Sequence, residues 1–179
     1  IVNASPIGDM TIFLLALDAT VHLQAPGQPR RALPLRDLYL GYKTLARAPE
    51  ELVVELSFPM IDKATRFSFE KVSKRRCLDI ATVNAAARLA VDDDGVVQDA
   101  HLSLGGVAPV PLYLRQASAW LRGRTLDATS ALKTVEIAMG EIAPISDVRG
   151  SAQYKRLLAR QLTLAHFVKL HPERVALSE

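Results

Sequence analysis

Hydrophobic residues in the first third of the chain occur in short runs separated by turn-forming residues. The run Met10–Asp18 is almost entirely apolar and predicts a short buried helix, which Ser5 or Asp9 could cap. After it, Thr20–Leu23 and Arg31–Leu35 predict two strands joined by a loop rich in proline and glycine. The segment Leu38–Tyr42 indicates a short loop or turn. A third predicted strand, Leu52–Phe58, ends at a proline.

The middle of the chain is typical of an antiparallel sheet. Arg66–Lys71 alternates apolar and polar residues. Ala81–Val91 is ambiguous by pattern because it contains many alanines. The run Asp92–Gly95 that follows is a strong hairpin turn, and it favours pairing of Ala81–Val91 with Val96–Leu104 over a helix. Gly105–Pro111 then predicts another turn.

The last third has the spacing of helices. Three helices are expected, over Tyr113–Leu121, Ser130–Ile142 and Ala152–Leu170. The candidate N-caps of the second and third helices are Asp127 or Thr129, and Ser151. The third helix is expected to bury one apolar stripe, formed by Leu157, Leu158, Leu162, Ala165 and Phe167.

Strands that precede helices, instead of alternating with them, predict the α+β class. A boundary between Pro59 and Thr65 divides the chain into two expected domains, residues 1–62 and residues 63–179. The front domain looks incomplete by its pattern, whereas the back domain looks self-contained. The chain also begins without an initiator methionine or a signal peptide, so we expect a fragment of a longer protein.

Composition narrows the function classes. Hydrophobic residues make up 49% of the 179 residues and aromatic residues only 6%, so the core must consist of Leu, Val, Ile and Ala. The net charge of +3 is mild, and the densest basic stretch, Lys71–Arg76, has no interleaved aromatic residue, which argues against nucleic-acid binding. No run reaches the roughly 18 apolar residues of a membrane span. The single cysteine, Cys77, excludes an internal disulfide and favours a reducing, cytoplasmic setting.

No complete active site is visible in the sequence, and no catalytic residue or metal ligand is assigned. The four histidines lack metal-ligand spacing and are interpreted as surface or helix-end residues: His22, His101, His166 and His171. The glycine pair Gly105-Gly106 is interpreted as a structural turn. Lys71 could contact a flavin or phosphate oxygen, because an ammonium is a compact charged donor. Alternation along its predicted strand is expected to point the Lys71 side chain away from the neighbours of Phe69. Arg149 is interpreted as forming an ion pair with Asp147.

Five runs in register resemble the FAD subunit of xanthine dehydrogenases, in the molybdenum hydroxylase family. They are Ile1–Asp9 (IVNASPIGD), which resembles the second half of an FAD-binding loop, Gly41–Leu52, Phe69–Asn84, Gly105–Pro109 and Pro144–Tyr154. The runs Ser-Lys-Arg-Arg and Ser-Asp-Val-Arg-Gly-Ser look more like xanthine dehydrogenase than carbon monoxide dehydrogenase. The resemblance implies the end of an FAD-binding domain, followed by a C-terminal flavoprotein domain with an antiparallel sheet and helices.

The resemblance also implies a function. Such a subunit passes electrons from molybdenum and iron–sulfur centres through FAD to NAD, in a hetero-oligomer with a molybdopterin-binding large subunit. The [2Fe–2S] and molybdopterin groups would lie on parts absent from this chain. Two alternatives stay open: a scaffold or interaction domain without catalytic role, or the FAD subunit of a sibling hydroxylase of the aldehyde or carbon monoxide dehydrogenase type.

Five residues match FAD contacts of the family by motif position. Asp9 offers a carboxylate to FAD hydroxyls, Val53 replaces the usual leucine against the flavin ring, and Lys71 falls on the flavin-site lysine. Asn3 and Ser5 are weaker candidates from the same loop as Asp9. The glycine-rich loop that binds the FAD diphosphate in the family would precede Ile1, so we expect that this chain alone does not hold FAD tightly.

Overall fold

The computed structural model describes residues 1–75 and 77–176, so Arg76 of the basic stretch lies outside the described residues. The helices and strands, including the 3-10 helix η1, follow in the order α1 (Asp9–Ala16), β1 (Thr20–Gln24), β2 (Arg31–Pro34), η1 (Leu35–Asp37), β3 (Tyr39–Gly41), β4 (Thr44–Leu45), β5 (Leu52–Ser57), β6 (Thr65–Val72), β7 (Val83–Val91), β8 (Val97–Gly105), β9 (Leu112–Tyr113), α2 (Arg115–Leu121), α3 (Ala128–Glu141) and α4 (Ala152–Leu170).

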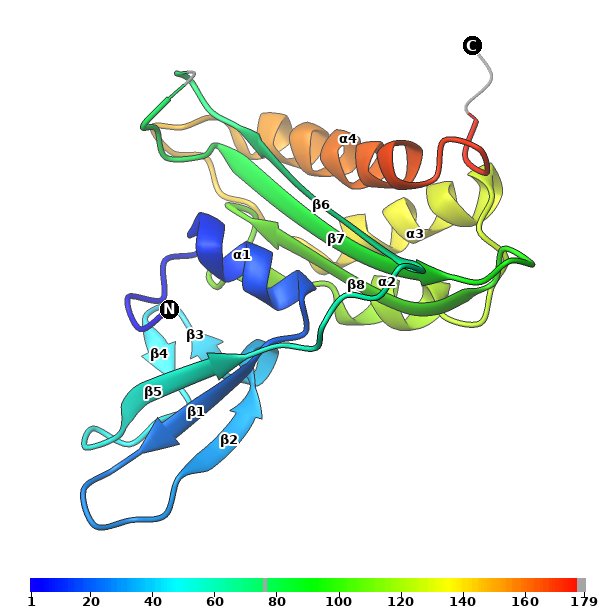
Figure 1. The fold of residues 1–179 in the computed structure, drawn as a ribbon. Coiled ribbons are helices and arrows are strands. Elements are labelled where there is room, and N and C mark those ends of the chain that lie inside the picture. The colour runs from blue at the N-terminus through cyan, green and yellow to red at the C-terminus, as the bar shows by residue number, and fades with distance from the viewer. Residues whose placement is uncertain (76, 177–179) are drawn as a thin grey trace.

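A four-stranded antiparallel sheet in the order β6-β7-β8-β9 forms the centre of the molecule. We call it the back sheet. Helices α2 and α4 pack on it, with α3 against both of them, and α1 packs on β7 and β8 from the other side (Figure 1). The predicted hairpin between β7 and β8 is confirmed, and its tip is fastened by a 2.8 Å hydrogen bond from the Val96 amide to the Asp92 carboxylate. Helices with an antiparallel sheet confirm the predicted α+β class.

Strand β7 is covered on both faces, which explains its alanine-rich sequence. Ala85 and Ala87 belong to the cluster beneath α2, α3 and α4, whereas Ala86 between them belongs to the cluster around α1. Each of the three is at most 1% exposed. A strand buried on both faces loses the apolar–polar alternation of a half-buried strand, so the pattern alone could not distinguish it from a helix.

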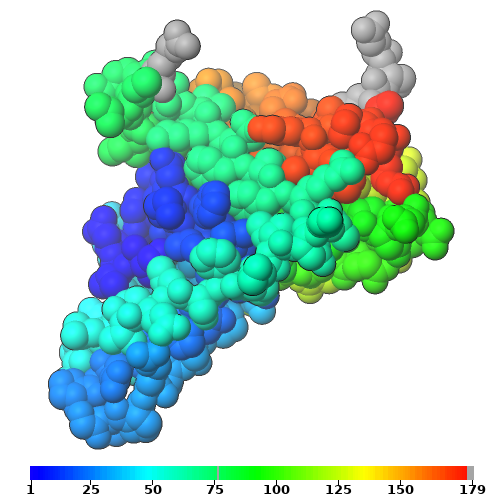
Figure 2. Space-filling model, viewed as in Figure 1, coloured from blue at the N-terminus to red at the C-terminus, as the bar shows by residue number. Residues whose placement is uncertain are grey.

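The first part of the chain forms a smaller sheet in the order β2-β1-β5, which we call the front sheet. It projects away from the body formed by the back sheet and its helices (Figure 2). Helix α1 links the two parts, and five of its eight residues are buried. A helix that is apolar on nearly all sides is expected between packed layers, and α1 contributes to the core that both parts share.

Three local predictions need correction. The segment predicted as a turn at Leu38–Tyr42 belongs to a short hairpin of β3 and β4, and a two-residue strand, β9, precedes α2. The N-cap of α1 is Gly8, without a side-chain cap, because the carboxylate of Asp9 binds elsewhere. By contrast, Asp127 and Ser151 cap α3 and α4 as predicted.

The buried face of α4 also differs from the predicted stripe, because Leu157 is 51% exposed. The buried residues are Lys155, Ala159, Thr163, His166, Phe167 and Leu170. Several polar side chains on this face are buried because each has a partner. Lys155 pairs with Asp147 at 2.7 Å, and the Thr163 hydroxyl donates to the Ala159 carbonyl at 2.7 Å. A pattern that counts only apolar residues cannot detect such a face.

The interpretation of the histidines as surface or helix-end residues is wrong for two of them. His101 and His166 are 2% and 1% exposed, and each has a hydrogen-bonding side chain beside it. His171 does lie at a helix end, where it is the C-cap of α4, although it is buried.

Within residues 1–75 and 77–176, no group of three or more metal-ligating side chains has a geometry that could hold a metal ion. None of the described helices has the length and hydrophobicity of a membrane span.

Candidate cofactor site

The N-terminal loop is held on the back sheet through its backbone carbonyl groups. The Gly106 amide donates to the Pro6 carbonyl at 3.0 Å, and the Asn84 side chain donates to the Ile7 carbonyl at 3.2 Å. Gly106 has φ of +83°, and a Cβ atom there would lie 2.5 Å from the carbonyl oxygen of Thr82, so glycine is required. The Gly105-Gly106 turn therefore helps to fix the loop Ser5–Asp9 on the back sheet.

Each carboxylate oxygen of Asp9 is bound by one side chain of the back sheet. Oδ1 accepts a hydrogen bond from Nδ2 of Asn84 at 2.6 Å, and Oδ2 accepts one from Nζ of Lys71 at 2.7 Å. The same Nζ donates to the Asp79 carbonyl at 2.6 Å. The Lys71 and Asp9 side chains keep 27% and 39% of their surface exposed, so a ligand can contact the pair.

The orientation expected for Lys71 is wrong. Phe67, Phe69 and Lys71 are alternate residues of β6 and point to the same face. The two phenylalanines contact Phe13 of α1, with ring centroids 4.6 Å and 6.3 Å apart, and Lys71 reaches Asp9 at the start of α1. The lysine therefore faces the N-terminal loop.

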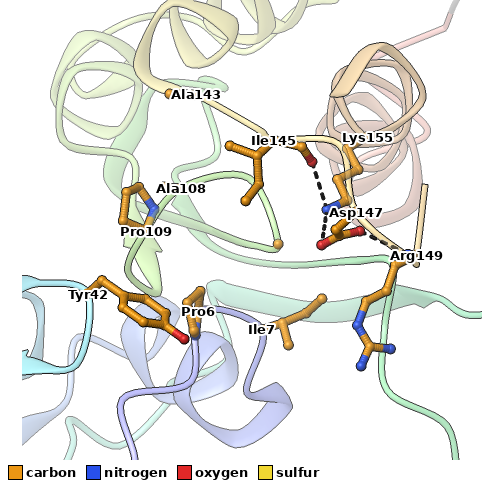
Figure 3. Close-up of a pocket in the computed structure, with 11 residues that line it drawn as sticks. Pro6, Ile7, Tyr42, Ala108, Pro109, Ala143, Ile145, Asp147, Arg149 and Lys155 are labelled. Carbon is orange, nitrogen blue, oxygen red and sulfur yellow. Dashed lines mark hydrogen bonds and ion pairs between the residues drawn. The ribbon is translucent and has the colours of Figure 1, made fainter. Parts of the chain in front are cut away.

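A cleft of about 540 Å³ opens between this loop and the segment before α4 (Figure 3). Its walls are mainly apolar and are formed by Pro6, Ile7, Tyr42, Gly106, Ala108, Pro109, Ala143 and Ile145. Its polar side consists of Asp147, Arg149 and Lys155. Burial raises the pKa of the Asp147 carboxyl, but hydrogen bonds from Lys155 and from the Arg149 amide, together with the Lys155 charge, outweigh it, so this pKa lies below its usual range. The Asp147–Lys155 pair is therefore a fixed wall of the cleft.

Beside the cleft lies a smaller hollow of about 310 Å³, whose lining includes Ser5, Asp9 and Asp79. Arg149 lines both spaces. The interpretation of Arg149 as the ion-pair partner of Asp147 is wrong, because that carboxylate pairs with Lys155. Only the backbone amide of Arg149 donates to Asp147, at 2.9 Å. Its guanidinium extends to the Ile80 carbonyl at 3.4 Å.

The other candidate residues occupy different places. Ser5 lines the small hollow with Asp9. Asn3 lies further out on the loop, where its carbonyl and side-chain oxygens each accept from Lys43 at 3.2 Å. Val53 lies on β5 of the front sheet, opposite Leu23. It is half-buried and packs against the hydrophobic cluster around α1. The structure therefore brings together Asp9, Lys71 and Ser5, while Val53 belongs to another sheet.

Sequence reasoning missed Asn84 as a site residue. A single asparagine followed by three alanines in a predicted strand is the sequence signal that could have identified it, and the residue is fully buried. Arg149 and the carbonyl of Asp79 were also missed, because their roles depend on loops that meet only in the fold.

The residues of this site fit a flavin in their donor and acceptor chemistry. A carboxylate accepts hydrogen bonds from ribityl hydroxyls, and an ammonium donates to a ring carbonyl oxygen. The cleft and hollow have volumes within the range of small-molecule sites, with apolar walls and a few convergent polar groups. Asp9 and Lys71 therefore carry acceptor and donor groups that fit the polar parts of FAD.

Comparison with known proteins identifies the family. Residues 68–170, more than half of the chain, match the CO dehydrogenase flavoprotein C-terminal domain. The chain belongs to this flavoprotein family. Residues 1–61 match the FAD binding domain in molybdopterin dehydrogenase. FAD is therefore the cofactor of the flavoprotein, as the resemblance implied.

Individual relatives agree with this assignment. The nicotinate hydroxylase of Emericella nidulans is 34% identical over 175 residues, 94% of this chain and 13% of that protein. The carbon monoxide dehydrogenase medium chain of Afipia carboxidovorans is 33% identical over 157 residues, 88% of this chain and 54% of that chain. The carbon monoxide dehydrogenase structure from Hydrogenophaga pseudoflava superposes with a TM-score of 0.86 at 26% identity, covering 98% of this chain and 60% of that one. The chain thus spans about half of the carbon monoxide dehydrogenase medium chain and a much smaller share of the nicotinate hydroxylase.

The relatives do not single out xanthine dehydrogenase. The xanthine dehydrogenase of Arabidopsis thaliana is 27% identical over 172 residues, below the nicotinate hydroxylase and the carbon monoxide dehydrogenase chain. The short runs that look most like xanthine dehydrogenase therefore carry less weight than the whole-chain identities.

Proposed function

We propose that the flavoprotein is the flavin-site part of an electron-transfer subunit in a molybdenum hydroxylase. Its partner would be a molybdopterin-binding large subunit, and electrons would pass from the metal centres through FAD to NAD. The observation that carries the proposal is the Asp9–Lys71 pair, which is partly exposed beside the cleft within segments that match FAD-binding and flavoprotein domains. FAD, when bound, supplies the two-electron redox chemistry, and the protein supplies its position and electrostatics.

The roles of the residues follow from their chemistry. The Lys71 ammonium is a compact charge with three donors, of which two bind Asp9 and the Asp79 carbonyl. A third donor remains for a carbonyl oxygen of a ligand, and the positive charge stabilises negative charge that develops there. The Asp9 carboxylate holds this ammonium in place and retains lone pairs for hydroxyl donors. The apolar cleft wall offers the adjacent space a surface for an uncharged part of the ligand.

For the substrate, we propose a xanthine dehydrogenase type of enzyme with NAD as acceptor. The basis is the match of the runs after Lys71 and around Asp147 to that enzyme type. A sibling hydroxylase is the second candidate, because the carbon monoxide dehydrogenase chain and the nicotinate hydroxylase are more similar overall. Turnover of the intact enzyme with xanthine, with an aldehyde, with nicotinate and with carbon monoxide distinguishes the candidates. NAD reduction that occurs with xanthine and with none of the other three substrates supports the xanthine dehydrogenase type.

The flavin role is tested in the full-length parent with Lys71→Met, which keeps the length of the side chain but removes its charge. We expect FAD binding about tenfold weaker, or a changed flavin midpoint potential, with only a small change in the melting temperature of the FAD-free enzyme. Lys133→Met is the matched control, because Lys133 pairs with Glu136 on the surface of α3. An unchanged flavin spectrum, affinity and midpoint in Lys71→Met would reject the proposed role.

A second experiment concerns the chain itself. FAD titrated into the 179-residue chain is expected to bind weakly, because the diphosphate-binding loop of the family is not among its motifs. Tight binding would show that Asp9, Lys71 and the cleft suffice.

A further inference from the structure

The alanine-rich strand β7 contains one fully buried asparagine, and we propose that this residue, Asn84, is the positioning residue of the flavin site. Its amide group holds the Asp9 carboxylate and the Ile7 carbonyl together, and so sets the direction in which Asp9 faces a ligand. This inference rests on the proposed function.

The orientation of the Asn84 amide is fixed by its partners. The Ile7 carbonyl and the Asp9 carboxylate are both acceptors, so only the NH₂ group can face them. The two hydrogen bonds measure 3.2 Å and 2.6 Å, and the shorter one ends on a charged oxygen. One rigid amide thus connects the loop backbone to the carboxylate that follows it two residues later.

The other end of the amide has no partner. Oδ1 of Asn84 is buried and makes no hydrogen bond within the described part of the chain. A buried acceptor without a partner destabilises a fold, and such an atom calls for an explanation. The next residues of β7, Ala85, Ala86 and Ala87, show that alanine fits this strand. Alanine would avoid the unpaired oxygen, so the asparagine is explained by its NH₂ group, which binds the Ile7 carbonyl and the Asp9 carboxylate.

The two oxygens of the Asp9 carboxylate have different partners, which explains how Asn84 positions it. Lys71 binds one carboxylate oxygen and Asn84 binds the other, from two neighbouring strands. Two anchors at the two oxygens fix the plane of the carboxylate. A carboxylate has about four lone-pair sites, so positions remain for a ligand in the hollow that Asp9 lines.

A nearby residue provides a matched control. Ser103 on β8 is also buried, and its hydroxyl donates to the Ile12 carbonyl of α1 at 2.7 Å. It holds the same helix to the same sheet but makes no contact with Asp9. Loss of Ser103 therefore tests anchoring of α1 alone, and loss of Asn84 tests anchoring together with positioning.

The experiment uses the full-length parent enzyme with Asn84→Ala, Asn84→Asp and Ser103→Ala. We measure FAD dissociation constants, flavin midpoint potentials and thermal stability. Asn84→Ala is expected to weaken FAD binding about tenfold and to change the midpoint, while Ser103→Ala changes only the stability. If the wild-type parent does not bind FAD, the proposed function fails. If it binds FAD and Asn84→Ala stays within twofold of it with the same midpoint, only the positioning role fails.

Asn84→Asp adds a pH readout that a structural role would not give. The new carboxyl would face the Asp9 carboxylate, with Lys71 as the adjacent cation and Arg149 and Asp79 across the hollow. When protonated, it can donate to Asp9 as the amide does; when ionised, it repels Asp9. We expect weak FAD binding at pH 8 and recovery toward the wild-type affinity at pH 6.

Equal weakening by Asn84→Asp at both pH values would overturn the proposal, as would an effect of Ser103→Ala on the midpoint as large as that of Asn84→Ala. If Asn84→Ala does not fold, the isosteric aspartate variant decides the question by the same pH comparison.

Discussion

A Cβ atom on Gly105 would lie 2.0 Å from Oδ1 of Asn84, so the side chain at position 84 depends on the glycine at position 105. Gly105→Ala must displace Asn84 or shift β8. Overpacking of a filled interior destabilises a protein by about 1–3 kcal/mol. We therefore expect Gly105→Ala to lower the free energy of unfolding by this amount and to weaken FAD binding as Asn84→Ala does. Urea unfolding and FAD titration measure the two effects.

Gly140 provides the matched glycine control. It lies in α3, is exposed, and a Cβ atom there would meet nothing within 4 Å. Gly140→Ala reduces the freedom of the unfolded chain without native strain, so it should stabilise the protein by about 0.4–1 kcal/mol. If both alanine variants are destabilised alike, the clash at Asn84 is not the cause.

The Asp9–Lys71 pair should matter more for the cofactor than for stability. Both side chains are partly exposed, and exposed ion pairs contribute about 0.2–1 kcal/mol in double-mutant cycles. A cycle of Asp9→Asn and Lys71→Met should give a coupling in that range in urea unfolding. The same cycle measured by FAD affinity should give a larger coupling, because both residues would contact one ligand. A coupling above about 2 kcal/mol in unfolding would instead make the pair a structural element.

Much of the fold follows from local sequence signals. The hairpin at Asp92–Gly95, the Asp127 and Ser151 caps and the long helix α4 each have a cause within a few residues of sequence. Local backbone preference and side-chain capping are sufficient there, because the partners are neighbours along the chain. The resemblance added Asp9 and Lys71, which the structure joins across 62 residues.

The remaining features depend on polar partners that a pattern of apolar positions does not reveal. His101 is buried because the Asp99 carboxylate lies 2.9 Å from its Nε2 and the Tyr113 hydroxyl lies 2.9 Å from its Nδ1. Lys155 is buried because Asp147 is next to it. Pattern reasoning treats polar residues as exposed, so it fails wherever folding provides a polar partner. Within the site, Asn84 is likewise a polar residue that is buried beside polar partners.

The ion pair of Arg88 with Asp99 is expected to be important for stability. Nη2 and Oδ2 lie 2.5 Å apart, and the Arg88 side chain is only 8% exposed. Asp99→Asn would leave the guanidinium charge buried without its partner, and loss of one member of a buried pair destabilises by about 3–5 kcal/mol. Because Asp99 is partly exposed, we expect Asp99→Asn to lower the free energy of unfolding by about 3 kcal/mol at pH 7, the low end of that range. Urea unfolding measures this loss.

The same pair predicts a pH dependence. Burial raises the pKa of the Asp99 carboxyl, but His101, Arg88 and Arg122 outweigh burial, and the pKa lies well below its usual range. The ionised Asp99 carboxylate therefore stabilises the folded protein fully above the unfolded-state pKa of about 4. This stabilisation is lost as the pH falls from there through the lower folded-state pKa. The difference between wild type and Asp99→Asn should shrink below pH 4. Glu136→Gln, in an exposed pair on α3, should change the stability by less than about 0.5 kcal/mol at any pH.

His166 should make the protein less stable at mildly acidic pH. It lies on α4 and faces β6, where its Nδ1 is 2.5 Å from the Ser68 hydroxyl, and burial lowers its pKa from 6.5 to about 4. The folded state therefore keeps a neutral imidazole where the unfolded chain takes up a proton, and stability falls between pH 6.5 and pH 4. At about 1.4 kcal/mol per pKa unit, the loss is roughly 3 kcal/mol. His166→Gln cannot be protonated, so its unfolding free energy should fall by that much less between pH 7 and pH 4. Parallel pH profiles for the two proteins would show that His166 is not the group responsible.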